Sequence, residues 1–295
     1  GVLVRNYHND YSNYRAQGNL DALLKEHGVL GICDIDTRYL TKMIRDEGAM
    51  MMIASTEISC KDELAKQLAA SPRIEDINYI EIVSTKESYV HKSGAWNHSI
   101  KAYDKAVMSD KKVVVIDFGV KRNILNELVQ SGLEVEVVPS TFKADDLIAR
   151  FEAKEIGGIF LSNGPGDPLT LINEKEQVQK LIGANIPMFA ICLGHQMLSI
   201  AHGYDTYKLK FGQHGGNHPV AYNGVVEITA QNHNYNVPDN IVEIADITHQ
   251  NLFDNTIEGV KYKNKEIFSV QHHPEASPGP HESKYIFAQF AKIVK

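Results

Sequence analysis

One segment of the sequence places a cysteine where it could act as a nucleophile. Cys192 follows the apolar run 187–191 and precedes Gly194, after which apolar residues recur at helical spacing. A cysteine at a sharp turn from strand to helix lies beside the partial positive charge of the helix N-terminus, which favours the thiolate. A buried cysteine at the end of a strand is the plainer explanation, and it is common. The glycine in the turn favours the nucleophile.

A second segment supplies a base and a carboxylate. His273, Pro274 and Glu275 follow the apolar residues of 267–270, so this tripeptide comes at the end of a predicted strand. Imidazole is the usual base for a thiol nucleophile, and a carboxylate two residues later can hold the ring and its tautomer. The tripeptide alone would more often be a surface turn. We interpret His272 as a neighbour of the base.

A third segment, Asn163 to Pro168, is rich in glycine and proline after the apolar run 159–161. Such residues make turns everywhere, and the segment by itself predicts only a turn. Gly164 and Gly166 would also let backbone N–H groups approach a substrate, because no Cβ intervenes.

The elements that must hold these segments alternate between strand and helix. Continuous apolar runs predict strands that are covered on both faces, and amphipathic stretches between them predict helices. The predicted strands are 113–116, 134–138, 159–161 and 187–192, and the predicted helices are 122–131, 144–152 and 174–181. This order predicts an α/β fold with a doubly wound, mainly parallel sheet, whose strands bind ligands at their carboxyl ends. Beyond Gly212 the segments become shorter and more strand-like.

The first hundred residues predict a smaller mixed α/β domain. Helices are expected over 19–27, from Asp36 or Thr37 to Gly48, and over 61–70, with a strand over 29–33. Polar residues without periodicity over 99–112 predict a linker, so we divide the chain into domains at 1–105 and 112–295. The chain begins at Gly1, directly in a strand-like segment, and we expect residues upstream of it.

Composition excludes several classes of protein. The formal net charge of −7 over 295 residues argues against nucleic-acid binding, and no apolar run is long enough to span a membrane. Three cysteines that match no zinc pattern fit a reducing cytoplasm. His214, His218 and His233 lack the companions and spacing of a metal site, so we predict no metal.

The three segments, taken together and in this order, resemble the class I, triad-type glutamine amidotransferases. The segments 210–219, 231–233 and 274–281 are similar to parts of the small subunits of carbamoyl-phosphate synthetases. Asp34 to Arg38, with Leu40, Thr41 and Arg45, resembles the amino-terminal domain of those subunits, which other amidotransferases lack. The resemblance covers nearly the whole chain.

That resemblance implies a mechanism and a set of contacts. Cys192 would attack the side-chain amide of L-glutamine and form a glutamyl thioester, with His273 as base and Glu275 orienting it. The implied glutamine contacts are Gly164, Gly166, Leu193, Gln196, Asn232, Asn234 and Tyr235, with the N–H groups of Gly164 and Leu193 as the oxyanion hole. Family members often carry Gly and Phe at the last two positions. Asn still tolerates a left-handed backbone there. A serine contact of the family has no counterpart here.

The resemblance also implies a partner, a large subunit that holds ATP, Mg²⁺ and bicarbonate and makes carbamoyl phosphate for arginine and pyrimidine biosynthesis. This chain would need no cofactor and would pass ammonia to that subunit. One alternative is a related amidotransferase or cysteine hydrolase, against which segments 34–49 and 210–219 argue. Another is a silent docking module, which has no need for all three of Cys192, His273 and Glu275.

Overall fold

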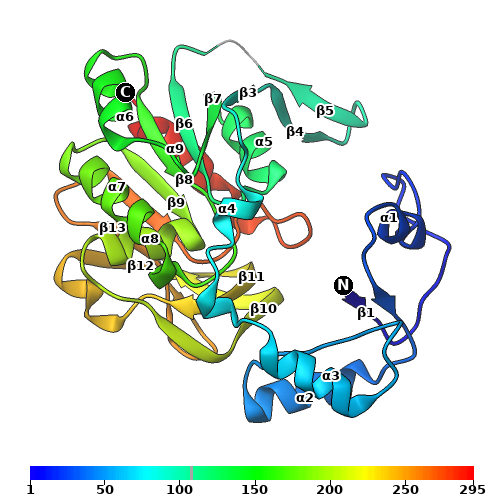
Figure 1. Ribbon diagram of the computed structural model, residues 1–295. Coiled ribbons are helices and arrows are strands. Elements are labelled where there is room, and N and C mark those ends of the chain that lie inside the picture. Colours follow the sequence, from blue (N-terminus) through cyan, green and yellow to red (C-terminus); the bar gives the residue numbers. More distant parts are fainter. Residues whose placement is uncertain (107–108) are drawn as a thin grey trace. The chain divides into compact units, whose positions relative to one another are not determined.

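The computed structural model describes residues 1–106 and 109–295, and the chain divides into two compact units, residues 1–54 and 55–295 (Figure 1). Val107 and Met108, inside the predicted linker 99–112, lie outside the described residues. The domain limits of 1–105 and 112–295 stay a prediction. None of the helices in the described part of the chain is both long and apolar enough to cross a bilayer.

The first unit contains short strands and helices close to those predicted. Its elements are β1 (Val2–Leu3), α1 (Leu20–Glu26), β2 (Gly31–Ile32) and α2 (Thr37–Glu47). The Asp36 side chain accepts a hydrogen bond from the Tyr39 N–H at 3.0 Å and so caps the first turn of α2. Gly48, at φ 100°, ends that helix in a conformation that glycine adopts most readily. Strands β1 and β2 pair in parallel.

The second unit holds the large sheet and the helices that cover it. Its helices are α3 (Lys61–Ala70), α4 (Ile80–Val83), α5 (Arg122–Gln130), α6 (Ala144–Glu152), α7 (Ile172–Gly183), α8 (Leu193–Ala201) and α9 (Tyr285–Ile293). Its strands are β3 (Tyr89–His91), β4 (Ser93–Asn97), β5 (Ala102–Lys105), β6 (Lys112–Asp117), β7 (Glu134–Pro139), β8 (Gly158–Leu161), β9 (Met188–Ile191), β10 (Tyr207–Tyr222), β11 (Val225–Asn236), β12 (Ala245–Asn251), β13 (Ile257–Tyr262) and β14 (Ile267–Val270).

Ten of these strands form one sheet, in the order β11-β10-β12-β13-β14-β9-β8-β6-β7-β3. The central strands β7, β6, β8, β9 and β14 are parallel, as the alternation of strand and helix predicted. The segments beyond Gly212 extend the sheet as antiparallel strands. The prediction of a doubly wound α/β fold is therefore confirmed, with an antiparallel extension at one side and a single antiparallel edge strand, β3, at the other.

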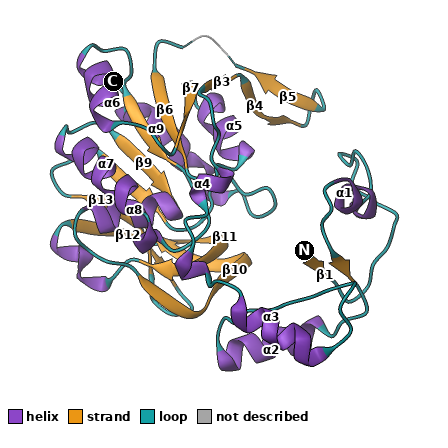
Figure 2. Ribbon diagram, in the orientation of Figure 1, coloured by secondary structure: helices purple, strands orange, loops and turns teal. Residues whose placement is uncertain are grey.

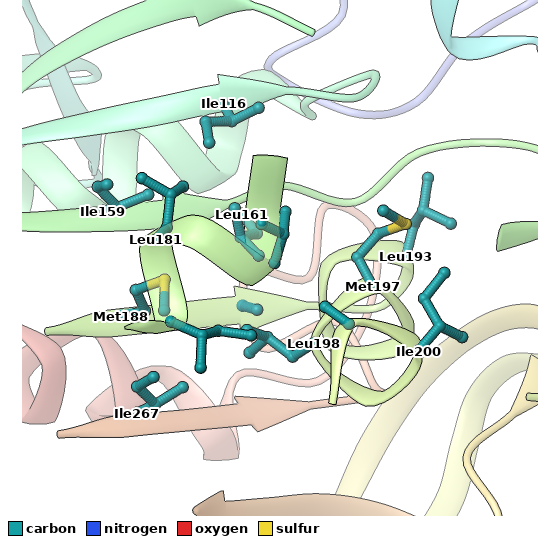
Figure 3. Packing of buried hydrophobic residues seen from close by; sticks show 14 of the residues in the cluster. Ile116, Ile159, Leu161, Leu181, Met188, Leu193, Met197, Leu198, Ile200 and Ile267 are labelled. Atoms are coloured by element: carbon teal, nitrogen blue, oxygen red, sulfur yellow. The ribbon is translucent and has the colours of Figure 1, made fainter. Parts of the chain in front are cut away.

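Alternate side chains of each central strand enter different cores, because successive residues of a strand point to opposite faces. Val114 and Ile116 of β6 pack with helices α6, α7 and α8, whereas Val113 and Val115 pack with α5 and α9. Helices therefore cover both faces of the sheet (Figure 2). In the first core, side chains of α7 and α8 lie against β8 and β9 (Figure 3). This packing fixes the carboxyl ends of the parallel strands.

Candidate active site

Cys192 lies at the turn between β9 and α8, in a backbone conformation that non-glycine residues rarely adopt. Its φ is 54° and its ψ is −107°, and such a strained turn is typical of a nucleophile elbow. The turn is possible because Gly194 has no side chain: a Cβ there would lie 2.3 Å from the Leu161 carbonyl oxygen. The sequence prediction of a sharp strand-to-helix turn at Cys192 matches the structure.

His273 reaches the same sheet edge because β14 and β9 are adjacent and parallel. Val270 of β14 pairs with Ile191 of β9, and the Cys192 N–H donates to the Val270 carbonyl oxygen at 2.9 Å. The first residues beyond the two strands therefore start from neighbouring positions. The His273 N–H donates to the Ala230 carbonyl oxygen at 2.9 Å, which ties this turn to β11.

The imidazole of His273 is held by Glu275. Nδ1 of His273 lies 2.7 Å from Oε1 of Glu275, and both side chains are buried. Within residues 1–106 and 109–295, Nε2 of His273 has no hydrogen-bond partner. An Nδ1–H bonded to the carboxylate leaves Nε2 as the atom that can exchange a proton with a neighbour.

Charges around this pair keep the imidazole protonated. Burial by itself lowers the pKa of His273, but the Glu275 carboxylate and the adjacent Cys192 sulfur raise it to about 10. Burial likewise raises the pKa of Glu275, and the His273 ring and the Lys121 ammonium more than offset this, so that the pKa is lowered. The two groups therefore favour an ion pair, with the proton on the ring.

Lys121 and Asn123 also contact Glu275, and neither was predicted from the sequence. Nζ of Lys121 lies 2.9 Å from Oε1 of Glu275 and donates to the Ala276 carbonyl oxygen at 2.6 Å. The Asn123 amide donates to the Glu275 carbonyl oxygen at 2.5 Å. Both residues follow β6, a central strand of the parallel sheet. The rule that sites lie at the carboxyl ends of such strands could have found them.

A cavity of about 790 Å³ opens in front of the cysteine and the histidine. It is lined by Ile74, Gly119, Lys121, Asn163, Gly164, Pro165, Gly166, Cys192, Gln196, Gly215, Gly216, Ala230, Gln231, Asn232, His233, Asn234, Tyr235, His273, Ser277, Pro278 and Gly279. The structure thus brings together residues from four regions of the chain that the sequence analysis treated separately. The volume is within the range of a small-molecule site.

Two predicted residues lie just behind the lining. Leu193 is buried at the first position of α8, where its backbone N–H is one of the free donors of a helix N-terminus. Glu275 is buried behind His273. The backbone and orienting roles that the resemblance implies for them stay predictions.

The glycine turn after β8 approaches the neighbouring strand end too closely for any other residue. A Cβ at Gly164 would lie 2.2 Å from the Phe118 carbonyl oxygen, and Gly166 has a φ of +97°. The segment is therefore more than a generic turn, because its backbone can line the cavity only as glycine.

The remaining predicted contacts come from α8 and β11. The Gln196 amide donates to the Tyr235 carbonyl oxygen at 2.8 Å and to Oε1 of Gln271 at 3.0 Å. Asn234 lies within β11, and its φ is not among the positive values, so the left-handed backbone that we considered for it is not used.

A histidine that we considered only as a metal ligand contacts two of these residues. Ring nitrogens of His214 lie 3.1 Å from Oδ1 of Asn232 and 3.3 Å from Oδ1 of Asn234. The ring thus lies between the two asparagine side chains. In the described part of the chain, no group of three His, Cys, Asp or Glu side chains could hold a metal ion.

Known families match both parts of the chain. Residues 114–293 match the model described as "Glutamine amidotransferase class-I", and residues 1–54 match "Carbamoyl-phosphate synthase small chain, CPSase domain". The chain is 59% identical to a carbamoyl phosphate synthase small chain of Helicobacter hepaticus, over 99% of this chain and 78% of that protein. It is 55% identical to one of Campylobacter jejuni, over 100% of this chain and 80% of that protein.

Solved structures agree on the fold. A putative GMP synthase subunit of Thermoplasma acidophilum superposes with a TM-score of 0.53 at 22% identity, covering 62% of this chain and 93% of that one. At this identity the likeness concerns the fold alone.

Proposed function

The chain belongs to the class I glutamine amidotransferases and, among them, to the carbamoyl phosphate synthase small chains, and from this premise we propose how it hydrolyses L-glutamine. Cys192 is the nucleophile, His273 the base and acid, and Glu275 the carboxylate that orients the ring. The observation that carries this proposal is the 2.7 Å contact between Nδ1 of His273 and Oε1 of Glu275, at a cavity that His273 shares with Cys192.

In the first half of the reaction, the sulfur of Cys192 bonds to the side-chain carbonyl carbon of glutamine. The proton that the thiol gives up already lies on Nε2 of His273 before the attack, and the pKa of about 10 for that ring favours this proton position. The carbon–nitrogen bond then breaks, and the imidazolium gives its proton to the departing ammonia. The product on the enzyme is a glutamyl thioester.

In the second half, water displaces the Cys192 sulfur from the same carbon. His273 takes a proton from the water while the water oxygen bonds to the thioester carbonyl carbon. The carbon–sulfur bond then breaks. Glutamate leaves and the Cys192 sulfur regains its proton. The ion pair between His273 and Glu275 stabilises the charged ring in both halves, because both groups are buried.

Backbone groups stabilise the negative oxygen that forms in each half. The N–H groups of Leu193, at the start of α8, and of Gly164, in the glycine turn, are the proposed donors. One such donor typically contributes about 2.7–4 kcal/mol to the stability of the transition state. The proposed glutamine contacts are Gly166, Gln196, Asn232, Asn234 and Tyr235, all of which line the cavity.

The ammonia is used, in this proposal, by a large carbamoyl phosphate synthase subunit in the cytoplasm. The family name supports such a partner, since a small chain implies a large one. We propose that the large subunit binds ATP, Mg²⁺ and bicarbonate, that this chain needs no cofactor, and that the carbamoyl phosphate serves arginine and pyrimidine biosynthesis. Co-expression of the two chains and size-exclusion chromatography test the partnership, and separate elution of the two chains contradicts it.

Replacement of the nucleophile tests the chemistry. Cys192→Ser should abolish the release of glutamate and ammonia from glutamine, because a serine hydroxyl at this site is a far weaker nucleophile than a thiol. The matched control is Cys60→Ser, which changes an exposed cysteine before α3 and should leave the rate unchanged. Glutamine hydrolysis at the wild-type rate in Cys192→Ser would remove the mechanism.

A further inference from the structure

A buried carboxyl group outside the catalytic triad lies behind the wall of the cavity. Glu258, on β13, is fully buried, and its two carboxyl oxygens contact two side-chain amides. Asn251 donates to Oε1 at 3.1 Å, and the amide of Gln231 lies 3.0 Å from Oε2. Carboxyl groups are almost never fully buried unless they are paired or hydrogen-bonded to neighbouring groups.

The contacts of Glu258 continue to the residues that line the cavity. Oε1 of Gln231 lies 3.0 Å from Nε2 of His233, and Nδ1 of His233 lies 2.9 Å from the Tyr235 carbonyl oxygen. Gln231, His233 and Tyr235 all line the cavity, on the same stretch of β11 as the proposed glutamine contacts. A chain of polar contacts therefore links Glu258 to the substrate-binding wall.

This stretch of β11 needs such support because its pairing with β10 is irregular. The register shifts between the pair Lys208–Tyr235 and the pair Gln213–His233, and again after Gly215–Gln231. The first bulge falls between His233 and Tyr235 and the second begins after Gln231, so the regular ladder is interrupted at both ends of this short stretch. Side chains that bond the backbone from behind can supply what the ladder lacks.

The protons of this chain of contacts can be counted. The buried ring of His233 is neutral, since burial lowers its pKa to about 3, and it therefore carries one N–H. Yet both ring nitrogens face oxygens, Oε1 of Gln231 and the carbonyl of Tyr235. One N–H cannot serve both, so one nitrogen lone pair would point at an oxygen lone pair.

Exchange of the amide N and O positions of Gln231 removes this conflict, because the two atoms have nearly the same shape. Its NH₂ group then donates to Nε2 of His233, and Nδ1–H of His233 donates to the Tyr235 carbonyl oxygen. The Gln231 oxygen now faces Glu258 and Thr229. The Thr229 hydroxyl, 3.0 Å away, can rotate to donate to that oxygen, in place of the hydrogen bond that it otherwise donates to the His218 carbonyl oxygen at 3.0 Å.

In this arrangement Glu258 must also donate, and only the protonated acid can do so. We propose that Glu258 is a neutral carboxylic acid whose O–H donates to the side-chain oxygen of Gln231. Through Gln231 and His233, this hydrogen bond positions strand β11, which carries proposed glutamine contacts. This is a positioning role, and it rests on the proposed function of the cavity. Oε1 of the acid still accepts from Asn251, whose own oxygen is held by the Phe253 N–H at 2.9 Å.

The electrostatics of the site support the neutral acid. Burial raises the pKa of Glu258 to about 8, against the smaller opposing effects of Asn251 and Gln231. The charged groups that act on it are Asp254, before β13, which raises the pKa, and His273, after β14, which lowers it. From strands β11 and β12, the groups that contact Glu258 are the uncharged side-chain amides of Gln231 and Asn251.

Two substitutions of Glu258 separate this proposal from a plain packing role. Glu258→Gln keeps one donor and one acceptor, so the KM for glutamine should stay within about twofold of wild type. Glu258→Leu loses both the donor and the acceptor. It should raise the KM for glutamine about tenfold, which corresponds to the loss of one hydrogen bond. The kcat should change less than the KM in Glu258→Leu, because binding is what is lost. The full-length chain is assayed with its large subunit, and Glu266→Gln, an exposed position before β14, is the control.

The KM values of the same two variants would contradict the proposal if Glu258 were an anion. The glutamine introduced by Glu258→Gln would then place its NH₂ against a donating amide of Gln231 or Asn251, so this variant would raise the KM as much as Glu258→Leu. In the wild type, the KM should rise as the pH passes about 8, and Glu258→Gln should lose that rise. A rise that persists in the variant also overturns the proposal.

Infrared spectroscopy tests the proton directly and does not depend on enzymatic activity. The wild type should show the carbonyl stretch of a protonated carboxylic acid at pH values below about 8, and the difference spectrum against Glu258→Gln should assign it. Absence of that band overturns the inference even if glutamine is hydrolysed. Presence of the band in a chain without glutaminase activity would instead contradict the proposed function alone.

Discussion

Removal of the Glu275 charge tests the electrostatic account of the site most directly. Glu275→Gln keeps the shape of the side chain but takes the negative charge from beside Nδ1 of His273, 2.7 Å away. A hydrogen bond to a charged group contributes about 1.5–3 kcal/mol. Since about 1.4 kcal/mol corresponds to tenfold, kcat/KM for glutamine should fall about 10- to 100-fold.

The pH dependence of the variant carries the sharper prediction. The pKa of His273 is about 10 because the Glu275 carboxylate and Cys192 outweigh burial. The proton on Nε2 is needed for the leaving ammonia, so wild-type kcat/KM should decline at alkaline pH as that proton is lost. Without the carboxylate, burial dominates and the pKa falls, so the decline should move to lower pH.

Glutamate release measured across the pH range checks both effects. An unchanged alkaline limb together with unchanged kcat/KM would refute the reasoning, because the charge of Glu275 would then be irrelevant to the ring. Glu266→Gln, an exposed carboxylate before β14, is the matched control and should behave as wild type.

A second variant separates the effect on His273 from the effect on Lys121. Glu275→Gln leaves the Lys121 ammonium without the carboxylate that lies 2.9 Å from it. If that unpaired cation were the sole cause of the loss, the double variant Lys121→Met with Glu275→Gln would recover activity. Our account predicts that the double variant stays impaired, with the alkaline limb still displaced.

Four further substitutions test the positions of particular side chains. Gly194→Ala should lower the free energy of unfolding and the activity together, since its Cβ would lie 2.3 Å from the Leu161 carbonyl oxygen; thermal unfolding and glutaminase assays measure both, and a stable, fully active variant contradicts the elbow geometry. His273→Asn should lower kcat by about 10²–10⁴-fold, the usual contribution of a general base, whereas His272→Asn should leave it nearly unchanged; the opposite result reassigns the base. Phe189→Ala should destabilise the second unit by about 3–5 kcal/mol, measured by urea unfolding, because this buried ring packs against four other aromatic rings; a change below about 1 kcal/mol contradicts that packing.

The sequence by itself determined the local elements of this protein, because apolar periodicity and capping residues act over short distances. Helices α3 and α6 begin and end where the pattern predicted, and Asp36 and Gly48 bound α2 for the reasons that the sequence suggested. The turns at Cys192 and at Gly164 were also visible, since each follows an apolar strand.

Tertiary structure decided how residues far apart in the chain meet. The parallel pairing of β14 with β9 brings His273 to the edge where Cys192 lies, and no local pattern sets that register. Lys121 gains its role only because Glu275 lies 2.9 Å from its ammonium, 154 positions further along the chain. In the sequence, Glu258 is an ordinary polar residue of a strand. Burial by the surrounding strands gives its carboxyl group a raised pKa and a proton to donate, because burial disfavours a charge.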